Sequence, residues 1–441
     1  MLQLFLLTAV LLHCATAIEW FISPTGRVNA SGSETDPFPS IPIAFQRAAF
    51  KADDIFTLEN GVYTDSFRLR LNSVPVTIRA RNAGNATINT GRDSARIDCA
   101  GSATKQSSLM LTGLLFYSGR PIINCTMCDA ALTNVQFIAV DLSSELVRFV
   151  SRFCPCLHSM LGSCAVFPLS HALHSRICSR FAAARGSSYV PFLECRGAAT
   201  VCTLTRCLFT ANVLADGGVF VRSWGAGVRV LQSTFEENSL NDPHPNRYVQ
   251  AVLVLAGRGD FEQSAFRGNQ FPFVSAMLGA SVLRLSDLTV TDNSLATSWV
   301  GMSPGVWVDA LDGGLDFRAE RCVFADNSQS AGEAGAIAVG LSAGAKNSVQ
   351  IAQCEFARNA IDTVFGEQGG AVMISDWYVP TGSVTSVKLT SNKFLLNSAP
   401  EQGGALTLNL RRGQVSAART CLYSSQKYSV ALFISVWSRP L

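Results

Sequence analysis

The chain has 441 residues, of which 48% are hydrophobic and 15% are charged, and its formal net charge at pH 7 is +3. An average soluble domain carries about 25% charged residues, so much of this surface must be built from Ser, Thr, Asn, Gln and Gly, a balance typical of β-rich proteins. So small a net charge argues against nucleic acid or an anionic membrane as the obligatory partner.

The N-terminal residues 1–17 have the pattern of a cleavable secretory signal. An apolar run from Leu4 to Leu12 is followed by the small-residue ending Ala-Thr-Ala. The run is shorter than the roughly 20 residues that span a bilayer, and no later stretch is long and apolar enough to do so. The sequence therefore predicts a secreted or surface-displayed protein with no transmembrane segment in the mature chain.

If the protein is secreted, its cysteines can form disulfides and three sequons can be glycosylated. The chain has 14 cysteines, and Cys14 lies in the signal, so an odd number remains in an oxidising compartment. At least one cysteine is then unpaired or paired outside the chain. The sequons at Asn29, Asn85 and Asn124 predict N-glycosylation if the source is a eukaryote.

Residues 18–65 indicate a strand, a polar loop, a short helix, a turn and a second strand. Trp20 and Ile22 alternate as in a strand, and the following stretch to Pro39 is rich in turn residues. The alanines and Phe45 between residues 44 and 49 then recur at helical spacing. This segment is expected to form an N-terminal cap and the first strand of a larger body.

This opening resembles that of right-handed parallel β-helix proteins of the pectate-lyase-like class. There a strand with Ser-Pro-x-Gly, a Pro-Phe loop, a helix with paired alanines, an acidic turn and Gly-Val-Tyr follow one another, and this chain has the same order. The resemblance implies that the helix covers the open edge of the first coil. It also implies that Asp53 and Asp54 belong to the turn, although adjacent carboxylates also suit acid–base work.

From Ile55 to about Val140, short aliphatic runs alternate with polar turns at spacings that fit coils of about 20 to 30 residues. Residues 141–197 break the pattern, and no Asp or Glu stands between Leu146 and Leu193. This atypical segment is either two poorly marked coils or an insertion. Its Cys and His residues allow a zinc site or disulfides, but the Cys-x-Cys spacing is tighter than in most zinc sites, so no metal is predicted.

A sequence repeat can be recognised between residues 199 and 412. Phe-x-x-Asn recurs, often followed by a Gly-Gly-Ala corner, and Val290 to Asn293 is a degenerate copy. One such unit cannot close a core, but stacked units bury each Phe on its neighbours and align the asparagines in a structural ladder. The predicted ladder consists of Asn212, Asn238, Asn269, Asn327, Asn359 and Asn397.

Three cysteines occupy one slot of this repeat, two residues before the Phe: Cys207, Cys322 and Cys354. Side chains stacked directly on adjacent strands lie farther apart than the roughly 3.8 Å between Cβ atoms that a disulfide prefers. Packed thiols are therefore favoured over a Cys322–Cys354 bridge.

The pairing of Phe-x-x-Asn with Gly-Gly-Ala and an aliphatic residue resembles the repeats of chlamydial polymorphic outer-membrane proteins, which are surface-displayed adhesins. The likeness covers roughly residues 199–412. It implies surface display and says little about the ligand. Residues 413–441 lose the repeat and are expected to be a degenerate tail or a cap over the last coil.

The fold class predicted from these patterns is all-β: a single right-handed parallel β-helix solenoid over residues 18–412, with a short N-terminal capping helix. The repeat spacing fits about nine to twelve coils. Coil insertions such as the stretch around His244 are where a binding face is expected, because insertions project from one side of a solenoid.

The class also includes polysaccharide lyases and glycoside hydrolases, which use clustered carboxylates, an Arg or Lys base and, in some cases, calcium. The densest acidic cluster here is Asp309, Asp312 and Asp316 beside Arg318. These four are weak catalytic candidates, because the Gly-Gly pair between them indicates a solvated turn.

We therefore expect a secreted or surface-displayed, non-enzymatic protein that is adhesin-like or glycan-binding, with a carbohydrate or a cell-surface protein as its partner and no cofactor. A polysaccharide lyase or glycoside hydrolase, with calcium, is the first alternative. A structural fragment of a larger surface protein is the second.

Overall fold

The computed structural model of the chain describes residues 17–48, 50–89, 94–102, 107–117, 120–138, 191–198, 200–214, 219–240, 250–277, 281–295, 303–310, 314–330, 332–342, 346–362, 369–378, 385–399, 404–410, 413–423 and 432–436. Nearly all of the predicted signal and most of the atypical segment, including its possible zinc ligands, lie outside these residues. No described helix is long and apolar enough to cross a membrane.

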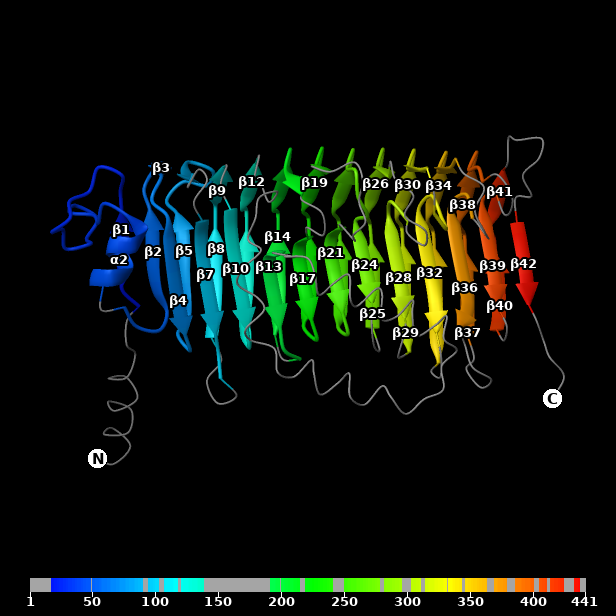
Figure 1. Ribbon diagram of the computed structural model, residues 1–441, viewed down its shortest axis with the longest axis horizontal. Coiled ribbons are helices and arrows are strands. Elements are labelled where there is room, and N and C mark those ends of the chain that lie inside the picture. Colours follow the sequence, from blue (N-terminus) through cyan, green and yellow to red (C-terminus); the bar gives the residue numbers. More distant parts are fainter. Residues whose placement is uncertain are drawn as a thin grey trace, which may run out of the picture.

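Three long parallel sheets run side by side along the body (Figure 1). The chain passes from sheet I to sheet II to sheet III and then begins the next coil, so each strand pairs with strands one coil before and one coil after. Sheet I consists of β1 (Glu19–Ile22), β2 (Asp54–Leu58), β5 (Val76–Ala80), β8 (Ser107–Thr112), β11 (Cys128–Thr133), β14 (Val201–Thr205), β18 (Gly227–Leu231), β22 (Arg258–Glu262), β25 (Ser281–Ser286), β29 (Leu315–Glu320), β33 (Asn347–Ala352), β37 (Thr385–Thr390) and β40 (Gly413–Ala418).

Sheet II contributes a short strand to each coil, and sheet III contributes a longer one. Sheet II consists of β3 (Gly61–Tyr63), β6 (Ala86–Ile88), β9 (Leu114–Tyr117), β12 (Gln136–Ile138), β15 (Leu208–Thr210), β19 (Thr234–Glu236), β23 (Ala265–Arg267), β26 (Thr289–Thr291), β30 (Val323–Ala325), β34 (Glu355–Ala357), β38 (Lys393–Leu395) and β41 (Cys421–Tyr423). Sheet III consists of β4 (Phe67–Asn72), β7 (Ser94–Ala100), β10 (Arg120–Thr126), β13 (Pro191–Arg196), β17 (Val219–Trp224), β21 (Gln250–Leu255), β24 (Val274–Met277), β28 (Val306–Ala310), β32 (Ile337–Ser342), β36 (Val372–Tyr378), β39 (Leu406–Leu410) and β42 (Leu432–Val436).

Two small parallel sheets lie between sheets II and III: β16 (Val213–Leu214) with β20 (Ser239–Leu240), and β27 (Ser294–Leu295) with β31 (Ser328–Gln329) and β35 (Ala360–Ile361). Within the described residues sheets II and III have twelve strands each, the upper end of the predicted range. Connections between parallel strands of one sheet are right-handed in about 98% of cases, so a right-handed coil is expected here. The prediction of an all-β, right-handed parallel β-helix is confirmed.

The interior is filled by residues that alternate with outward-facing ones along every strand. β4, with the sequence FRLRLN, shows this strictly, because Phe67, Leu69 and Leu71 are buried and the residues between them are exposed. In sheet II the repeat Phe residues stack coil on coil, with ring centroids 4.5 Å apart between Phe209 and Phe235 and 4.7 Å apart between Phe356 and Phe394. Stacking of this kind gives each coil a core that no single coil has.

The degenerate copy interrupts this stack. Val290 lies in register between Phe266 and Phe324, where a smaller side chain occupies less volume. Nearby, Phe271 and Phe273 are buried against Phe266, with centroids at 6.1 and 4.9 Å from it. Two aromatic rings from the segment after β23 therefore pack beside the last phenylalanine before the interruption, consistent with the close packing of protein interiors.

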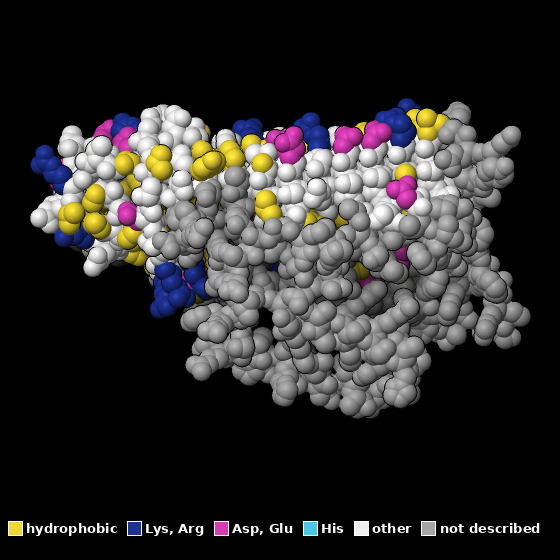
Figure 2. All heavy atoms as spheres, turned by 45° about the horizontal axis from the view of Figure 1, so that its top comes forward, with side chains coloured by type: hydrophobic (Ala, Val, Ile, Leu, Met, Phe, Trp, Pro, Cys, Tyr) yellow, Lys and Arg dark blue, Asp and Glu magenta, His cyan; other side chains and the backbone are white. Residues whose placement is uncertain are grey.

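Two corners recur in many of the coils. A residue with left-handed backbone is followed by a buried side chain, most often Cys, Ser or Asn, as in Arg321-Cys322 between sheets I and II and Arg358-Asn359 after sheet II. The left-handed residues point outward and pair between coils: Arg321 with Asp287 at 2.8 Å, and Arg358 with Asp326 at 2.6 Å. Figure 2 shows charged side chains of both signs along the upper edge of the body.

The short helix α2 (Ile41–Arg47) covers the first coil, as the sequence indicates. Phe45 stacks on Phe56 of β2 with ring centroids 4.1 Å apart, and Ile41 and Ala44 are buried. Asp54 lies at the start of β2 and accepts hydrogen bonds from the backbone N–H groups of Ile18 and Lys51 and from the Trp20 indole, at 2.9 to 3.0 Å. These hydrogen bonds hold the N-terminal segment against the first coil.

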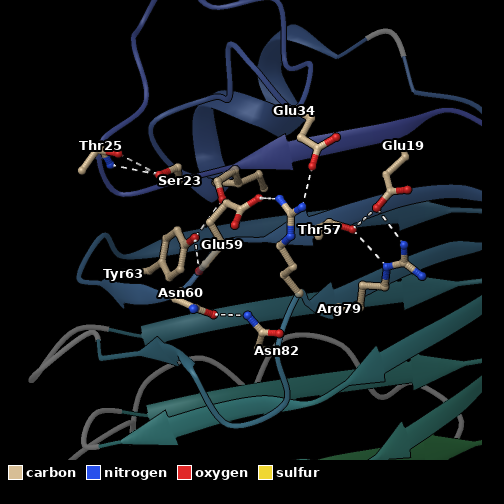
Figure 3. Close-up of polar contacts among 12 residues, drawn as sticks. Glu19, Ser23, Thr25, Glu34, Thr57, Glu59, Asn60, Tyr63, Arg79 and Asn82 are labelled. Atoms are coloured by element: carbon tan, nitrogen blue, oxygen red, sulfur yellow. Dashed lines mark hydrogen bonds and ion pairs between the residues drawn. The ribbon is translucent and has the colours of Figure 1, made fainter.

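A network of charged and polar side chains binds the N-terminal loop to the first coils (Figure 3). Arg81 contacts both Glu34 of the loop and Glu59, at 2.6 Å from the latter. The Tyr63 hydroxyl donates toward the carbonyls of Ile22 and Glu59, both at 2.9 Å, and burial raises its pKa. These contacts join the loop, β1 and β2 into one closed end.

Regular strands continue beyond the boundaries that the repeat marks in the sequence. β13 lies at the end of the atypical segment 141–197, yet it pairs in register with β10 and β17. β40, β41 and β42 lie within residues 413–441 and extend all three sheets by one more strand. Coils therefore form there without the Phe-x-x-Asn signature.

Candidate functional site on the outward face of sheet I

The outward face of sheet I carries its charged residues in register. Because side chains alternate between the two faces of a strand, every second residue of β18, β22, β25 and β29 points away from the core. One row, read coil by coil, runs Arg229, Asp260, Arg284, Arg318, Gln350 and Lys388. The row beside it runs Val201, Gly227, Arg258, Val282 and Asp316.

A hollow of about 470 Å³ lies on this face across β14, β18, β22 and β25. Gly227 has no side chain where its row neighbours are Val201 and Arg258, and this leaves space in the surface. Arg229 and Arg284 line the hollow from the adjacent row. We call this feature, including Asp260 and Glu262, the sheet I hollow.

Positive charge exceeds negative charge among the side chains that line the hollow: three guanidiniums face two carboxylates. Arg258 engages Asp260 through two hydrogen bonds, Nε to Oδ2 at 2.7 Å and a second nitrogen to Oδ1 at 3.1 Å. Arg229 forms no ion pair among the described residues, and Arg284 lies 4.0 Å from Asp316. The hollow therefore offers guanidinium groups to an anionic ligand.

An exposed indole lies one corner away from the hollow. Trp224 ends β17 and is 41% exposed, and Gly225 and Ala226 connect it to Gly227. Val201, which lines the hollow, is 39% exposed. Aromatic rings expose an apolar face at low conformational cost, and this is the kind of surface on which the apolar face of a sugar ring packs.

The row that contains Arg229 carries no charged residue in the coils of β5, β8, β11 and β14, which precede the hollow. Its outward positions in β5, β8, β11 and β14 are Thr77, Met110, Ala131 and Thr203 in one row. Met110 is 46% exposed, and the three others are partly exposed. This row of sheet I thus presents small and apolar side chains that lead into the hollow, whereas Arg79 and Asp129 lie at other outward positions of the same strands.

The structure separates the four weak catalytic candidates. Asp316 and Arg318 point outward from β29 and pair at 3.0 Å. Asp309 is 6% exposed on β28 of sheet III, with Oδ1 beside the position of Gly340 one coil on. Asp312 lies outside the described residues. The described members therefore come from two different sheets and do not form one acidic group.

The repeat asparagines form a continuous row in the interior. Each side chain donates to the side-chain oxygen of the next asparagine at 2.7 to 3.1 Å, and the backbone N–H donates to the same oxygen. The row includes Asn293 of the degenerate copy, and its members are at most 2% exposed. Its amides are satisfied by one another and by phenylalanine carbonyls of sheet II, so the row is closed to a ligand.

The sequons differ in accessibility. Asn29 and Asn85 are exposed, and Asn29 Oδ1 accepts a hydrogen bond from Arg47. Asn124 is half-buried in β10, and its Nδ2 donates to Asp98 at 2.8 Å. The nitrogen that would carry a glycan is therefore already engaged at Asn124, whereas the other two asparagines are exposed residues.

The repeat cysteines are buried thiols in the structure. Burial raises the pKa of Cys207 to about 12, which suppresses thiolate chemistry there. Cys322 donates its backbone N–H to Cys354 Sγ at 3.4 Å, so these two residues are joined by a hydrogen bond. Disulfides within the described residues join Cys99 to Cys128 and Cys195 to Cys202.

The sheet I hollow was not found from the sequence, although a signal for it exists. The outward row of Arg229, Asp260, Arg284, Arg318, Gln350 and Lys388 stands six residues before the repeat Phe or Val of each copy. An alignment of the copies on their aromatic residue would have shown one variable, polar column at that offset. The described residues contain no cluster of three or more His, Cys, Asp or Glu that could hold a metal.

No protein-family model matches the chain, and no curated protein resembles it in sequence. Among solved structures it is similar to a rhamnogalacturonan lyase, at 10% identity and a TM-score of 0.37, covering 91% of this chain and 87% of that one. It is also similar to a pectate lyase (11%, TM-score 0.35, 92% and 79% covered). A third is a PL6 alginate lyase in complex with a trisaccharide (12%, TM-score 0.36, 97% and 90% covered). This likeness concerns the fold alone.

Proposed function

We propose that this protein is a secreted or surface-displayed, non-enzymatic β-helix protein that binds an acidic polysaccharide along the outward face of sheet I. The observation that supports this most directly is the sheet I hollow, where guanidiniums outnumber carboxylates and Arg229 has no ion pair among the described residues. Carboxylate or sulfate groups of a glycan would take the place of that missing partner. An adhesin that holds a glycan-bearing surface would use the same chemistry.

The uncharged row before the hollow gives the glycan a second kind of contact. Sugar rings carry apolar C–H faces as well as hydroxyls, and Met110, Ala131 and the threonines of the same rows offer apolar contact with scattered hydroxyls. Trp224 adds an exposed ring beside the hollow. The ligand would therefore lie along the row direction, across successive strands, with an anionic group at the hollow.

The alternative is a polysaccharide lyase or glycoside hydrolase. Hydrolysis needs two carboxyl groups, one of which must be protonated at working pH, and elimination needs a basic group that can lose its proton. Asp260 and Asp316 each accept hydrogen bonds from a neighbouring guanidinium, so both carboxylates are already engaged in ion pairs. This arrangement suits recognition of charge better than acid catalysis.

The test is retention of the purified protein on immobilised polyuronates, sulfated glycans and neutral glucans at low and high salt. We expect binding to the acidic glycans that weakens as salt rises. Arg229→Ala with Arg284→Ala should weaken it about tenfold or more. Arg70→Ala is the matched control, because Arg70 is exposed on β4, on another sheet. Equal loss in the control variant, or retention without regard to glycan charge, would contradict the proposal.

The same samples distinguish the enzyme alternative. Incubation with each polysaccharide, with and without calcium, is followed by assays of new reducing ends and of unsaturated uronate products. Binding without products supports the proposal. Products that disappear in the Arg229→Ala, Arg284→Ala variant would replace it with the lyase or hydrolase reading.

A further inference from the structure

Five cysteines gather where sheet III turns into sheet I in three successive coils. At the first of these corners Cys99 faces Ser107, at the second Cys125 faces Cys128, and at the third Cys195 faces Cys202. Cys99, Cys125 and Cys195 are directly in register across β7, β10 and β13. All five are at most 2% exposed.

The two disulfides of this group use different geometries. Cys99–Cys128 ties the first corner to the second, with Cα atoms 6.1 Å apart, and so joins successive coils. Cys195–Cys202 crosses the third corner within a single coil, with Cα atoms 6.4 Å apart. Cys125 remains a free thiol at the second corner.

Cys125 has the same place at its corner that Cys195 has at the next one. Only Thr126 and Met127 separate it from Cys128, so the second corner carries a Cys-x-x-Cys motif. At the third corner a disulfide closes a longer turn, because Cys195 and Cys202 are seven residues apart and Cys202 is in register with Ala130, beyond Cys128. Cys-x-x-Cys pairs can close as disulfides, and Cys125 is in register with Cys99, the present partner of Cys128. Cys128 therefore has two candidate partners: Cys99 of the preceding coil and Cys125 of its own.

We propose that the disulfide at Cys128 switches between these partners by thiol–disulfide exchange. The Cys125 thiol gives up its proton and its Sγ attacks Cys128 Sγ; the Cys99–Cys128 bond breaks, a Cys125–Cys128 bond forms, and Cys99 leaves as a thiolate that takes up a proton. One disulfide and one thiol are present before and after, so no oxidant is consumed. The released sulfur has a polar neighbour in place, because Cys99 Sγ lies 3.3 Å from Ser107 Oγ.

The exchange changes which parts of the chain the disulfide at Cys128 links. In the present pairing it fastens the coil of β7 to the coil of β11, and after exchange it closes one corner and leaves those coils joined by non-covalent contacts alone. Burial, with a contribution from the charge of Asp129, raises the pKa of Cys125 to about 12. The closed fold therefore holds little thiolate at neutral pH and keeps the fastening between coils, and opening of the corner or a rise in pH releases it.

The inference is tested by incubating the purified protein at pH 7 and pH 8, quenching with acid, alkylating the free thiols and mapping the linked peptides by mass spectrometry. We expect Cys125 to be alkylated at first, and then a growing fraction with alkylated Cys99 and a Cys125–Cys128 link. Below the thiol pKa the thiolate fraction rises about tenfold per pH unit, so exchange should be about tenfold faster at pH 8. Cys195–Cys202 serves as the internal control.

Two variants keep the test decisive. Cys125→Ser should retain Cys99–Cys128 at every time point, and Cys99→Ser should form Cys125–Cys128 on mild oxidation. The proposal fails if folded Cys99→Ser, recognised by an intact Cys195–Cys202 link, leaves both Cys125 and Cys128 open to alkylation. It also fails if Cys125 of the native protein pairs with a cysteine of the third corner. Neither outcome depends on glycan binding.

Discussion

The asparagine row and the sheet I hollow are both built from polar side chains repeated coil by coil, but they have opposite relations to water. The asparagines are buried, and each amide donates to the next in the row. The arginines of the hollow stand at the same strand spacing on the outside, where Arg229 has no ion pair among the described residues. Repetition inside the coil therefore satisfies the polar groups within the protein, whereas repetition outside leaves them available to a ligand.

The largest expected effect comes from breaking the interior row. Asn327→Leu removes the acceptor of Asn293 and the donor to Asn359, each in a hydrogen bond below 3 Å, and leaves both partners buried. We expect the free energy of unfolding to fall by about 3 kcal/mol, because each buried group left without a partner costs about 1 to 3 kcal/mol. Urea unfolding followed by circular dichroism measures it.

The matched control for this change is an amide pair on the surface. Asn82 donates to Asn60 at 3.1 Å in the exposed N-terminal region (Figure 3). Asn82→Leu should shift stability by less than about 0.5 kcal/mol, since solvent replaces the lost partner. Equal losses in the two variants would show that burial is not what makes the row stabilising.

A smaller effect is expected from Asp54, a buried charge that accepts three hydrogen bonds. Although burial alone acts to raise it, the hydrogen bonds from Ile18, Lys51 and Trp20 lower the pKa of this carboxyl. A lowered folded pKa gives stability that is present above the unfolded pKa of about 3.9 and is lost as pH falls through the folded value. Asp54→Asn should cost about 2 kcal/mol at pH 7 and progressively less below about pH 3.9.

Urea unfolding at a series of pH values from neutral to acid checks this prediction. Asp65→Ala is the control, because Asp65 is exposed in the loop before β4. A difference between the native protein and Asp54→Asn that stays constant with pH would mean that the carboxylate charge is not what holds the cap.

The smallest expected effect on stability belongs to the hollow. Arg229→Ala with Arg284→Ala should leave the free energy of unfolding within about 0.5 kcal/mol of the native value, because exposed guanidiniums with weak or no ion pairs contribute little. The same variant should lose glycan retention. Thermal unfolding measured beside the retention assay separates the two, and a large drop in stability would place these arginines with the structural residues.

Much of the fold was predictable because the repeat constrains it. Phe356 and Asn359 recur at fixed spacing, and stacking of identical coils is the arrangement that buries such residues. The segment that contains β13 stayed undecided between poorly marked coils and an insertion, and the segment that contains β42 was expected to be a tail or a cap. Other aliphatic residues fill the same inward positions there without the motif. In these coils the interior must be filled to the right volume, and several apolar residue types can do so.

The site was harder to predict because the residues that line it do not repeat. Asp309 and Asp316 are close in sequence, but a corner of the coil intervenes, so they belong to different sheets. Arg229 and Arg284 are far apart in sequence, but the register of sheet I places them on either side of Asp260. In a solenoid, two side chains lie close together when they hold the same position in successive coils. Strand register therefore indicates which residues share a site, whereas closeness in the sequence does not.

The strict register of sheet I has a consequence for the strength of binding. Neighbouring strands are about 4.8 Å apart, so each further coil repeats the outward row at a fixed interval. A polymer that lies along the row meets several weak contacts at once, and after the first contact the others form at a high effective concentration. Overall avidity then depends on the number of coils that a glycan spans, so short oligosaccharides should bind far more weakly than the chains from which they are cut.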